Sequence, residues 1–349
     1  MKSNASKYII VGAGLSGLTC AYRLLNAGIE DFIILEARSR VGGRIFTKNS
    51  VDMGATWFQD QHTQLRALCN ELELGHFPQY QDGKSILIYN SMAPAHYFES
   101  DTSGAVAKRL TGGSSKLIDI LYEKLNQKTH LNTCLTSISN NNLQLELKTN
   151  KGIFNAEKVI ISLPPKLASN ITYPTMLPKQ LYTSMQKTHT WMSNAIKVGI
   201  KYNTTFWREK GLSGTIIGQI GPVIELYEHN CADNKTFGLM GFVNEALREL
   251  SPDERKQTIL EYLAKHLGKE SLSYVDYFEK DWSEDPYTSC TNIKSVYMSI
   301  GYGNPLYESF YLDGRLLFSG TETASQFGGY LEGAVRSGEY AAKMLIQHS

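Results

Sequence analysis

The sequence predicts an α/β protein in which a domain with a central parallel sheet and a β-meander is interleaved with a smaller domain built on a mixed sheet. Three observations predict this architecture. A length of 349 residues exceeds what one hydrophobic core usually organises. An apolar strand at residues 8–11 is followed by a glycine-rich turn, an apolar-periodic helix and a second strand. Short apolar strands recur at residues 159–163 and 315–322, so one sheet should draw on distant segments of the chain.

The turn after the first strand has the spacing of a dinucleotide-binding βαβ unit. Gly12 permits a tight turn, Gly14 lets the backbone approach a pyrophosphate, and Gly17 lets the helix pack closely on the strand. The helix N-terminus directs its free N–H groups at the phosphates. Glu36 ends the second strand and is placed to accept hydrogen bonds from ribose hydroxyls. The pattern predicts a Rossmann-like fold that holds NAD, NADP or FAD, and the alternative is an ordinary βαβ turn without a ligand.

Periodicity and turn residues predict the remaining elements. Gly28 should end the first helix as its C′ residue. In the later helix, Ser251, Pro252 and Glu254 have the pattern of a capping box with proline at N1. In chain order we expect a helix at residues 64–74, a strand at 86–89, a helix from Thr111 with Leu117, Leu121 and Leu125 on one face, strands at 135–139 and 143–147, a strand at 159–163, longer strands at 195–202 and 215–227, a helix at 252–267, and a last helix opening near Tyr330.

Composition excludes several classes of protein. The net charge is +1 with scattered basic residues, which argues against nucleic acid as a partner. Five cysteines without a Cys-x-x-Cys pair favour a reducing compartment, and the histidines lack metal-ligand spacing, so no metal is expected. No apolar run approaches the ~20 residues of a membrane span, and no signal peptide or tail anchor is visible. We therefore expect a soluble cytoplasmic protein without a membrane anchor.

Longer motifs narrow the choice of cofactor, because an Arg-x-Gly-Gly-Arg loop and a Gly-Thr-Glu-Thr-Ala segment are more specific than the glycine turn. Such segments run through nearly the whole chain, at residues 11–18, 35–38, 40–44, 54–57, 281–282, 320–324 and 329–334. With them the chain resembles the flavin-containing amine oxidases, the monoamine and polyamine oxidase family. The resemblance favours FAD strongly over NAD.

The resemblance implies that widely separated segments hold one extended FAD. Gly14 and Ser16 would meet the pyrophosphate, Arg44 a phosphate or ribityl oxygen, and Glu322 the ribityl end. The Leu135 backbone would contact adenine, and the last helix would aim its N–H groups at the flavin N1–C2=O edge, where negative charge develops on reduction. The implied cofactor residues are Gly12, Ala13, Gly14, Ser16, Gly17, Glu36, Arg38, Gly42, Gly43, Arg44, Gly54, Ala55, Thr56, Trp57, Leu135, Trp282, Glu322, Tyr330 and Leu331.

Three catalytic residues follow from the same resemblance. Lys197 matches a strand lysine that holds a water near flavin N5, Tyr330 matches one wall of an aromatic cage around the amine, and Trp282 matches a tryptophan near the flavin. From the residues alone, Lys197 alternates with Ala195 and Gly199 as a solvent-facing lysine would. The alternative for Trp282 is a plain core indole.

Glu225 is a substrate candidate from its strand pattern. It alternates with Val223 and Tyr227 in a segment that falls where the family lines its pocket. A carboxylate there would pair with the distal ammonium of a diamine. The alternative is a surface acid at the edge of a sheet.

The sequence also departs from the family pattern. It is short between about residues 90 and 108, so the pocket should be more open and the short relative renalase becomes a comparison. The second cage position falls near Thr291 or Asn292, and neither is aromatic. Cys290 lies one residue before the position of covalent flavin attachment in monoamine oxidases, which leaves that link open and favours non-covalent FAD.

These inferences predict an FAD-dependent amine oxidase that turns a primary or secondary amine into an imine and then an aldehyde, with O2 reduced to H2O2. Its partners are a small amine and O2, and the protein is a monomer or homodimer. Alternatives are a renalase-like or desaturase-like flavoenzyme on a non-amine, an L-amino-acid oxidase, and a flavin-binding protein without catalysis. We assign residues 1–79, 110–190 and 289–349 to the FAD-binding domain and residues 80–109 and 191–288 to the substrate domain.

Overall fold

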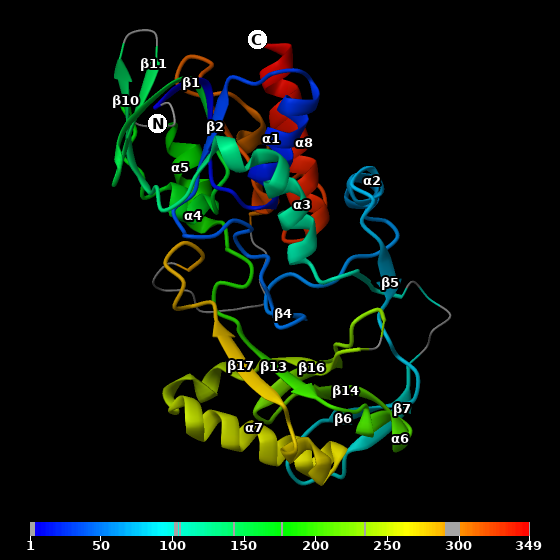
Figure 1. The fold of residues 1–349 in the computed structure, drawn as a ribbon. Coiled ribbons are helices and arrows are strands. Elements are labelled where there is room, and N and C mark those ends of the chain that lie inside the picture. Colours follow the sequence, from blue (N-terminus) through cyan, green and yellow to red (C-terminus); the bar gives the residue numbers. More distant parts are fainter. Residues whose placement is uncertain are drawn as a thin grey trace.

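The computed structural model describes residues 4–100, 104, 106–141, 144–175, 177–233, 235–289 and 301–348. Two seven-stranded sheets form opposite halves of the molecule, and both ends of the chain lie in the half drawn at the top of Figure 1. Within the described part of the chain, no helix has the length and apolar character that crossing a membrane requires.

The first sheet is parallel at its centre and continues into an antiparallel meander, as predicted. Its order is β10-β11-β12-β1-β2-β9, and β18 also pairs with β12 in parallel. Because β1 lies between β12 and β2, the sheet joins segments from both ends and the middle of the chain. The strands are β1 (Ala5–Val11), β2 (Phe32–Leu35), β9 (Thr129–His130), β10 (Leu135–Asn141), β11 (Gln144–Thr149), β12 (Gly152–Ile161) and β18 (Leu316–Phe318).

Helices cover both faces of this sheet. On one face α1, α2, α3 and α8 share a buried core with β1 and β2, and on the other face α4 and α5 cover β10 to β12. A Cβ added to Gly338 of α8 would lie 2.4 Å from Ser16 O, so α1 and α8 pack at close range (Figure 1). The helices are α1 (Leu15–Asn26), α2 (Thr63–Glu71), α3 (Ser115–Leu125), α4 (Pro165–Ala168), α5 (Lys179–Lys187) and α8 (Leu331–Gln347), with 3-10 turns η1 (Asn126–Lys128), η4 (Pro305–Glu308) and η5 (Thr321–Thr323).

The second sheet is mixed, with the order β17-β13-β16-β15-β14-β6-β7. Apolar residues of α7 (Pro252–Leu267) pack on one of its faces, at the bottom of Figure 1. The other elements of this half are β6 (Lys84–Ile88), β7 (His96–Glu99), β13 (Ile196–Tyr202), α6 (Phe206–Glu209), β14 (Leu212–Gly218), β15 (Val223–Glu228), β16 (Phe237–Val243), η2 (Glu245–Glu249), η3 (Lys269–Leu272) and β17 (Asp276–Asp281). Two short antiparallel pairs complete the strands: the hairpin of β3 (Thr47–Lys48) with β4 (Val51–Asp52), and β5 (His76–Pro78) with β8 (Lys108–Leu110).

Local signals located most elements correctly. The capping box of Ser251 and Glu254 is present, and Gly28 has a φ of +75° directly after α1. One prediction is wrong: residues 215–227 form the hairpin β14–β15, not one long strand, and Gly221 has a φ of +105° in its turn. The helix predicted from Thr111 begins at Ser115, and the predicted strand residue Leu143 lies outside the described residues. The division into two domains stays a prediction.

Candidate active site

A cavity of about 630 Å³ lies between the two halves of the molecule. Its lining comes from the loops after β1, β2, β12 and β18, from residues 133–136, and from β13, β15 and β16 of the second sheet. Most of the predicted cofactor residues line it, namely Gly12, Gly14, Ser16, Glu36, Arg38, Gly42, Gly43, Arg44, Gly54, Ala55, Thr56, Trp57, Leu135, Glu322, Tyr330 and Leu331. Three predicted cofactor residues do not line it: Ala13, Gly17 and Trp282.

The three turn glycines have the separate roles that their spacing predicts. Gly12 has a φ of +105°, and a Cβ there would lie 2.4 Å from Ser162 O. A Cβ on Gly17 would lie 2.0 Å from Gly12 O, so this glycine allows the helix to approach the strand. An added Cβ on Gly14 would meet no atom within 4 Å, because it would project into open space. Gly14 therefore leaves room for a ligand beside the N-terminus of α1.

The Glu36 carboxylate is fixed at the wall of the cavity. It is 3% exposed, and its oxygens accept hydrogen bonds from the main-chain N–H groups of Ala13 (2.8 Å) and Arg38 (2.9 Å). The Arg38 guanidinium donates to Asp285 Oδ1 at 2.7 Å and to Thr288 Oγ1 at 2.9 Å. This end of the cavity therefore includes residues 286–288, which the sequence did not identify.

Arg44 and Glu322 form a two-pronged ion pair in the wall of the cavity. The Arg44 Nη1 and Nη2 atoms lie 2.5 and 2.9 Å from the two Glu322 oxygens, and Glu322 is fully buried. Arg44 Nη1 also donates to Trp191 O at 3.1 Å, which joins the segment before β13 to the first half. Both residues line the cavity, so this pair is a fixed part of its wall.

Lys197 is buried in the wall between the halves, so the solvent-facing alternative is wrong. It is 1% exposed, and its Nζ donates to Asp52 O (3.0 Å), Gly54 O (2.8 Å) and Thr56 Oγ1 (3.1 Å). The Phe242 ring centre lies 4.9 Å from the same nitrogen. Burial lowers the pKa of Lys197 to about 7, and the charges of Asp52 and Glu225 oppose that shift.

Because the pKa of Lys197 is lower in the folded than in the unfolded state, the free energy of unfolding should depend on pH. An exposed lysine in the unfolded chain has a pKa of about 10.4, so the unfolded state binds more protons than the native state between about pH 7 and pH 10. The contribution of Lys197 to stability is therefore full above pH ~10 and is lost as the pH falls toward 7. In urea denaturation, the wild type should gain stability relative to Lys197→Met as pH rises through this window. If the stabilities of the two proteins changed in parallel with pH, the proposed effect of Lys197 burial on stability would be contradicted.

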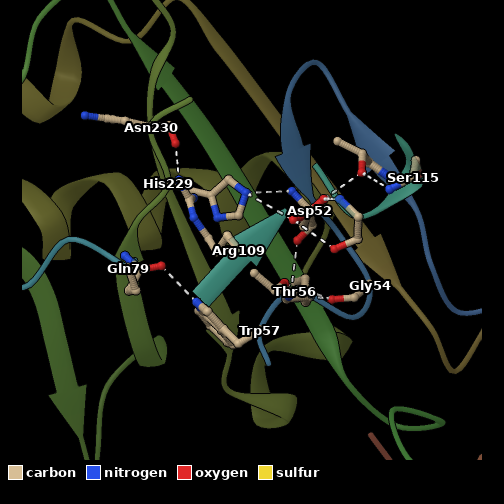
Figure 2. A network of polar contacts seen from close by, with 12 residues as sticks. Asp52, Gly54, Thr56, Trp57, Gln79, Arg109, Ser115, His229 and Asn230 are labelled. Carbon is tan, nitrogen blue, oxygen red and sulfur yellow. Dashed lines mark hydrogen bonds and ion pairs between the residues drawn. The ribbon is translucent and has the colours of Figure 1, made fainter. Parts of the chain in front are cut away.

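Polar and aromatic side chains surround the part of the cavity next to Lys197. Glu225 Oε2 accepts a hydrogen bond from the Tyr227 hydroxyl at 2.9 Å, and the Trp57 ring packs edge-on against Tyr227. Trp57 Nε1 donates to Gln79 Oε1 at 2.8 Å (Figure 2). Because β15 lies between β14 and β16, the sheet-edge alternative for Glu225 is wrong. Glu225 is half-buried and lines the cavity.

Tyr330 lies at the N-terminus of α8 and also lines the cavity. It is 57% exposed, and its ring centre lies 5.4 Å from that of His62. Its carbonyl accepts a hydrogen bond from the Thr321 hydroxyl at 2.7 Å, which fixes the start of the helix. The helix dipole places partial positive charge at this point of the wall.

Trp282 lies behind the wall, where its indole is fully buried. Its Nε1 donates to Met53 O at 2.8 Å, and it packs with Met192 and Ala195. This environment corresponds to the core-indole alternative. Trp282 therefore holds Met53, the residue before the lining segment 54–57, without lining the cavity itself. The predicted positions Cys290, Thr291 and Asn292 lie outside the described residues.

Some lining residues were not identified from the sequence. Ser162 and Leu163 follow β12 directly, and the rule that ligands bind at the carboxyl ends of parallel strands could have found them. Trp191 and Phe242 had no comparable signal. Phe242 stands opposite Lys197 in the pairing of β13 with β16, and only that register brings it to the cavity.

Several features of the lining suit a flavin dinucleotide. Open space at Gly14 adjoins a helix N-terminus that suits phosphate, and the fixed Glu36 carboxylate suits ribose hydroxyls. The small residues 54–56 offer a flat backbone surface near Lys197, and α8 offers a positive helix end. A cavity volume of about 630 Å³ lies within the range of ligand sites of this kind.

Comparisons with known proteins agree with this description. The family model for flavin containing amine oxidoreductases matches residues 15–92 and 87–346, and the two matches meet next to the region predicted to be short. The probable flavin-containing monoamine oxidase A of Dictyostelium discoideum is 26% identical over 96% of this chain and 96% of its own. The flavin-containing amine oxidase B of Canis lupus familiaris is 31% identical over 71% of this chain and 48% of its own.

Solved structures match the whole fold. Putrescine oxidase bound to putrescine superposes with a TM-score of 0.85 at 25% identity, covering 98% of this chain and 99% of that one. Cyclohexylamine oxidase from Brevibacterium oxydans gives a TM-score of 0.86 at 18% identity, with coverage of 98% and 99%. At 18% identity, the similarity to cyclohexylamine oxidase shows the fold alone.

Proposed function

The chain belongs to the family of flavin-containing amine oxidoreductases, and on that premise we propose that it is an FAD-dependent oxidase of primary or secondary amines. The amine becomes an imine that hydrolyses to an aldehyde, and O2 is reduced to H2O2. The observation that carries the proposal is the burial of Lys197 in the wall of a cavity whose other end carries the glycine turn and Glu36. When bound, FAD supplies the acceptor for the hydride that leaves the amine carbon.

In this proposal FAD lies along the cavity and is held without a covalent link. Gly14 and Ser16 bind the pyrophosphate, Glu36 binds the ribose, and the Arg44–Glu322 pair binds the ribityl end. The N-terminus of α8 stabilises negative charge at the pyrimidine end of the flavin. The remaining proposed contacts are Gly12, Arg38, Gly42, Gly43, Gly54, Ala55, Thr56, Trp57, Leu135, Tyr330 and Leu331.

The proposed substrate position is the space between Tyr330 and Glu225. Tyr330 offers an aromatic face to the amine, and Trp57, which packs edge-on against Tyr227, offers a second. The Lys197 ammonium lies in the wall next to this space and stabilises negative charge that develops on O2 as it is reduced. Glu225 provides a carboxylate for a second, distal ammonium, so we propose a preference for diamines.

Glu225→Gln should separate diamines from monoamines. Losing the carboxylate removes a charge-assisted contact, so kcat/KM for a diamine should fall about 30-fold, whereas that for a monoamine of equal chain length should change by less than about threefold. Steady-state rates on a series of diamines and matched monoamines measure this effect. Tyr227→Phe removes only the hydroxyl that donates to Glu225 and is the matched control, with a smaller loss expected for the diamine. Equal losses on both substrate series would contradict this role.

The proposed function is tested by anaerobic titration of the purified yellow protein with a panel of amines. We expect at least one amine to bleach the flavin absorbance and, in air, to release H2O2 in proportion to the aldehyde formed. The competing amino-acid oxidase reaction needs an arginine facing a substrate carboxylate. Among the described lining residues, however, Arg38 and Arg44 are already paired with Asp285 and Glu322. Bleaching only by amino acids or by non-amine substrates would overturn the proposal, as would protein that takes up no flavin.

A further inference from the structure

Lys197 is held by one short segment, residues 52–56, that begins at the last residue of β4. Its Nζ donates to Asp52 O, Gly54 O and Thr56 Oγ1 at 2.8–3.1 Å. The Thr56 hydroxyl donates in turn to Gly54 O at 3.2 Å (Figure 2). Three acceptors match the three hydrogens of an ammonium group. The position of Lys197 therefore depends on whatever fixes residues 52–56.

The Asp52 carboxylate anchors this segment to its surroundings. Asp52 is 1% exposed and accepts hydrogen bonds from Thr47 Oγ1 (2.6 Å), Ser114 N (2.9 Å) and Ser114 Oγ (3.1 Å). Burial acts to raise the pKa of Asp52, whereas the hydrogen bonds from Thr47 and Ser114 act to lower it and favour the ionised carboxylate. A charged carboxylate thus lies on the same residue whose carbonyl accepts from Lys197.

His229 fixes Asp52 from the opposite side without adding charge. The Asp52 main-chain N–H donates to His229 Nε2 at 3.1 Å, whereas the carboxylate is 3.6 Å from that atom (Figure 2). An Nε2 that accepts a hydrogen bond carries no proton, so the imidazole is neutral. Burial and the nearby Arg109 lower the pKa of His229 to about 4, in agreement with this geometry.

Arg109 is the buried cation of this network. It is 4% exposed, packs over the Phe77 ring at 4.7 Å and donates to Asn230 O. Its Nε and Nη1 atoms have no hydrogen-bond partner among the described residues. Burial lowers its pKa to about 10, and the Asp52 charge opposes that shift, so Arg109 is charged at neutral pH.

Two further charged groups face Lys197. Glu225 lies on β15 and its negative charge acts on Lys197 in the same direction as that of Asp52. Lys280 stands opposite Lys197 on β17, with its ammonium 3.9 Å from Asp285 Oδ2. On β16 the residue opposite Lys197 is the uncharged Phe242. Of the two acids that act on Lys197, Asp52 is the one that is fully buried and bonded to the same segment.

We propose that Asp52 is a positioning residue for Lys197: its carboxylate fixes the carbonyls that hold the lysine and supplies the charge that keeps it an ammonium, while Arg109 offsets that charge. This inference rests on the proposed role of Lys197 in the oxidase reaction. It assigns opposite electrostatic effects on Lys197 to two residues, Asp52 and Arg109, neither of which lines the cavity. If Asp52 and Arg109 had only a structural role, replacing them would not shift the titration of Lys197 in opposite directions.

The test is the titration of the Lys197 side chain in the full-length protein. Its protonation is monitored through the NMR resonance of the lysine 13Cε atom. The resonance is assigned by its absence in Lys197→Met. Asp52→Asn keeps the shape of the side chain and should lower the titration midpoint by about one pH unit. Arg109→Met keeps an apolar chain over Phe77 and should raise the midpoint by about half a unit. If Asp52→Asn does not fold, the upward shift of the Lys197 titration midpoint in Arg109→Met still tests the proposed effect of these charges on Lys197.

Glu228→Gln is the matched control, because Glu228 is equally buried but is paired with Arg208 and Trp207. It should lower stability and leave the Lys197 midpoint near that of the wild type. An unchanged midpoint in Asp52→Asn, or shifts of the same sign in Asp52→Asn and Arg109→Met, would overturn the inference. The measurement needs no amine, so a failure of the proposed oxidase activity would show separately, as flavin that no amine reduces.

Discussion

Lys197→Met should slow the reoxidation of reduced flavin by O2 about 100-fold, while the rate at which an amine bleaches the flavin changes by less than about threefold. The physical reason is that a positive charge in a wall closed to water stabilises developing negative charge far more than the same charge in solvent. Methionine preserves the volume of the side chain and removes the charge. Stopped-flow mixing of the anaerobically reduced protein with O2, followed at 450 nm, measures the step directly.

Lys201→Met is the control for this experiment. Lys201 lies on the same strand as Lys197, on the same face, but is partly exposed at the far end of β13. Its substitution should leave both half-reactions near wild-type rates. If Lys197→Met reoxidises as fast as the wild type, Lys197 has no role in the reaction with O2, and its burial then serves only to join the two halves.

Glu322→Ala should cost about 3 kcal/mol of unfolding free energy, because it leaves the Arg44 guanidinium in the wall without its partner. Glu322 is fully buried, and both of its oxygens are bonded to Arg44. Urea denaturation of the protein freed of flavin isolates this cost from any loss of ligand binding. The same variant should also retain less flavin after gel filtration.

Two further variants test whether the loss of the Arg44–Glu322 ion pair causes the fall in stability. Glu71→Ala removes a more exposed partner of Arg23 and should cost far less. The double variant Arg44→Met with Glu322→Leu replaces the pair by apolar groups and should recover much of the stability, but not the flavin retention. A Glu322→Ala protein as stable as wild type would show that Arg44 finds another partner or reaches water.

None of the described residues in the region predicted to be short lines the cavity. Residues 87–92 mark the junction of the two family matches, and β6 and β7 form the far edge of the second sheet beside them. Tyr89, Met92 and Tyr97 are exposed there. The walls next to Lys197 are therefore supplied by the sheet itself, through β13, β15 and β16.

Local sequence signals predicted the structure correctly wherever the determining interactions lie within one short segment of the chain. The positive φ of Gly12 and Gly28, the capping box of Ser251 and the leucine stripe of α3 follow from steric and hydrogen-bonding rules within a few residues. The hairpin between β14 and β15 was missed although Gly221-Pro222 is a turn signal inside the predicted strand, and the antiparallel pairing of Ile217 with Glu225 shows the reversal.

The sequence alone determined the Rossmann-like frame, the glycine turn and the resemblance that points to FAD, because each motif behind them is a short run of neighbouring residues. Only the tertiary structure decided that Lys197 is buried, that Glu225 lies within a sheet, and that Trp282 stands behind the wall. Strand alternation assigns a side chain to a face, but what covers that face depends on partners such as Asp52 and Phe242, 145 and 45 residues away. Burial and the pKa shifts that follow from it are therefore properties of the assembled fold.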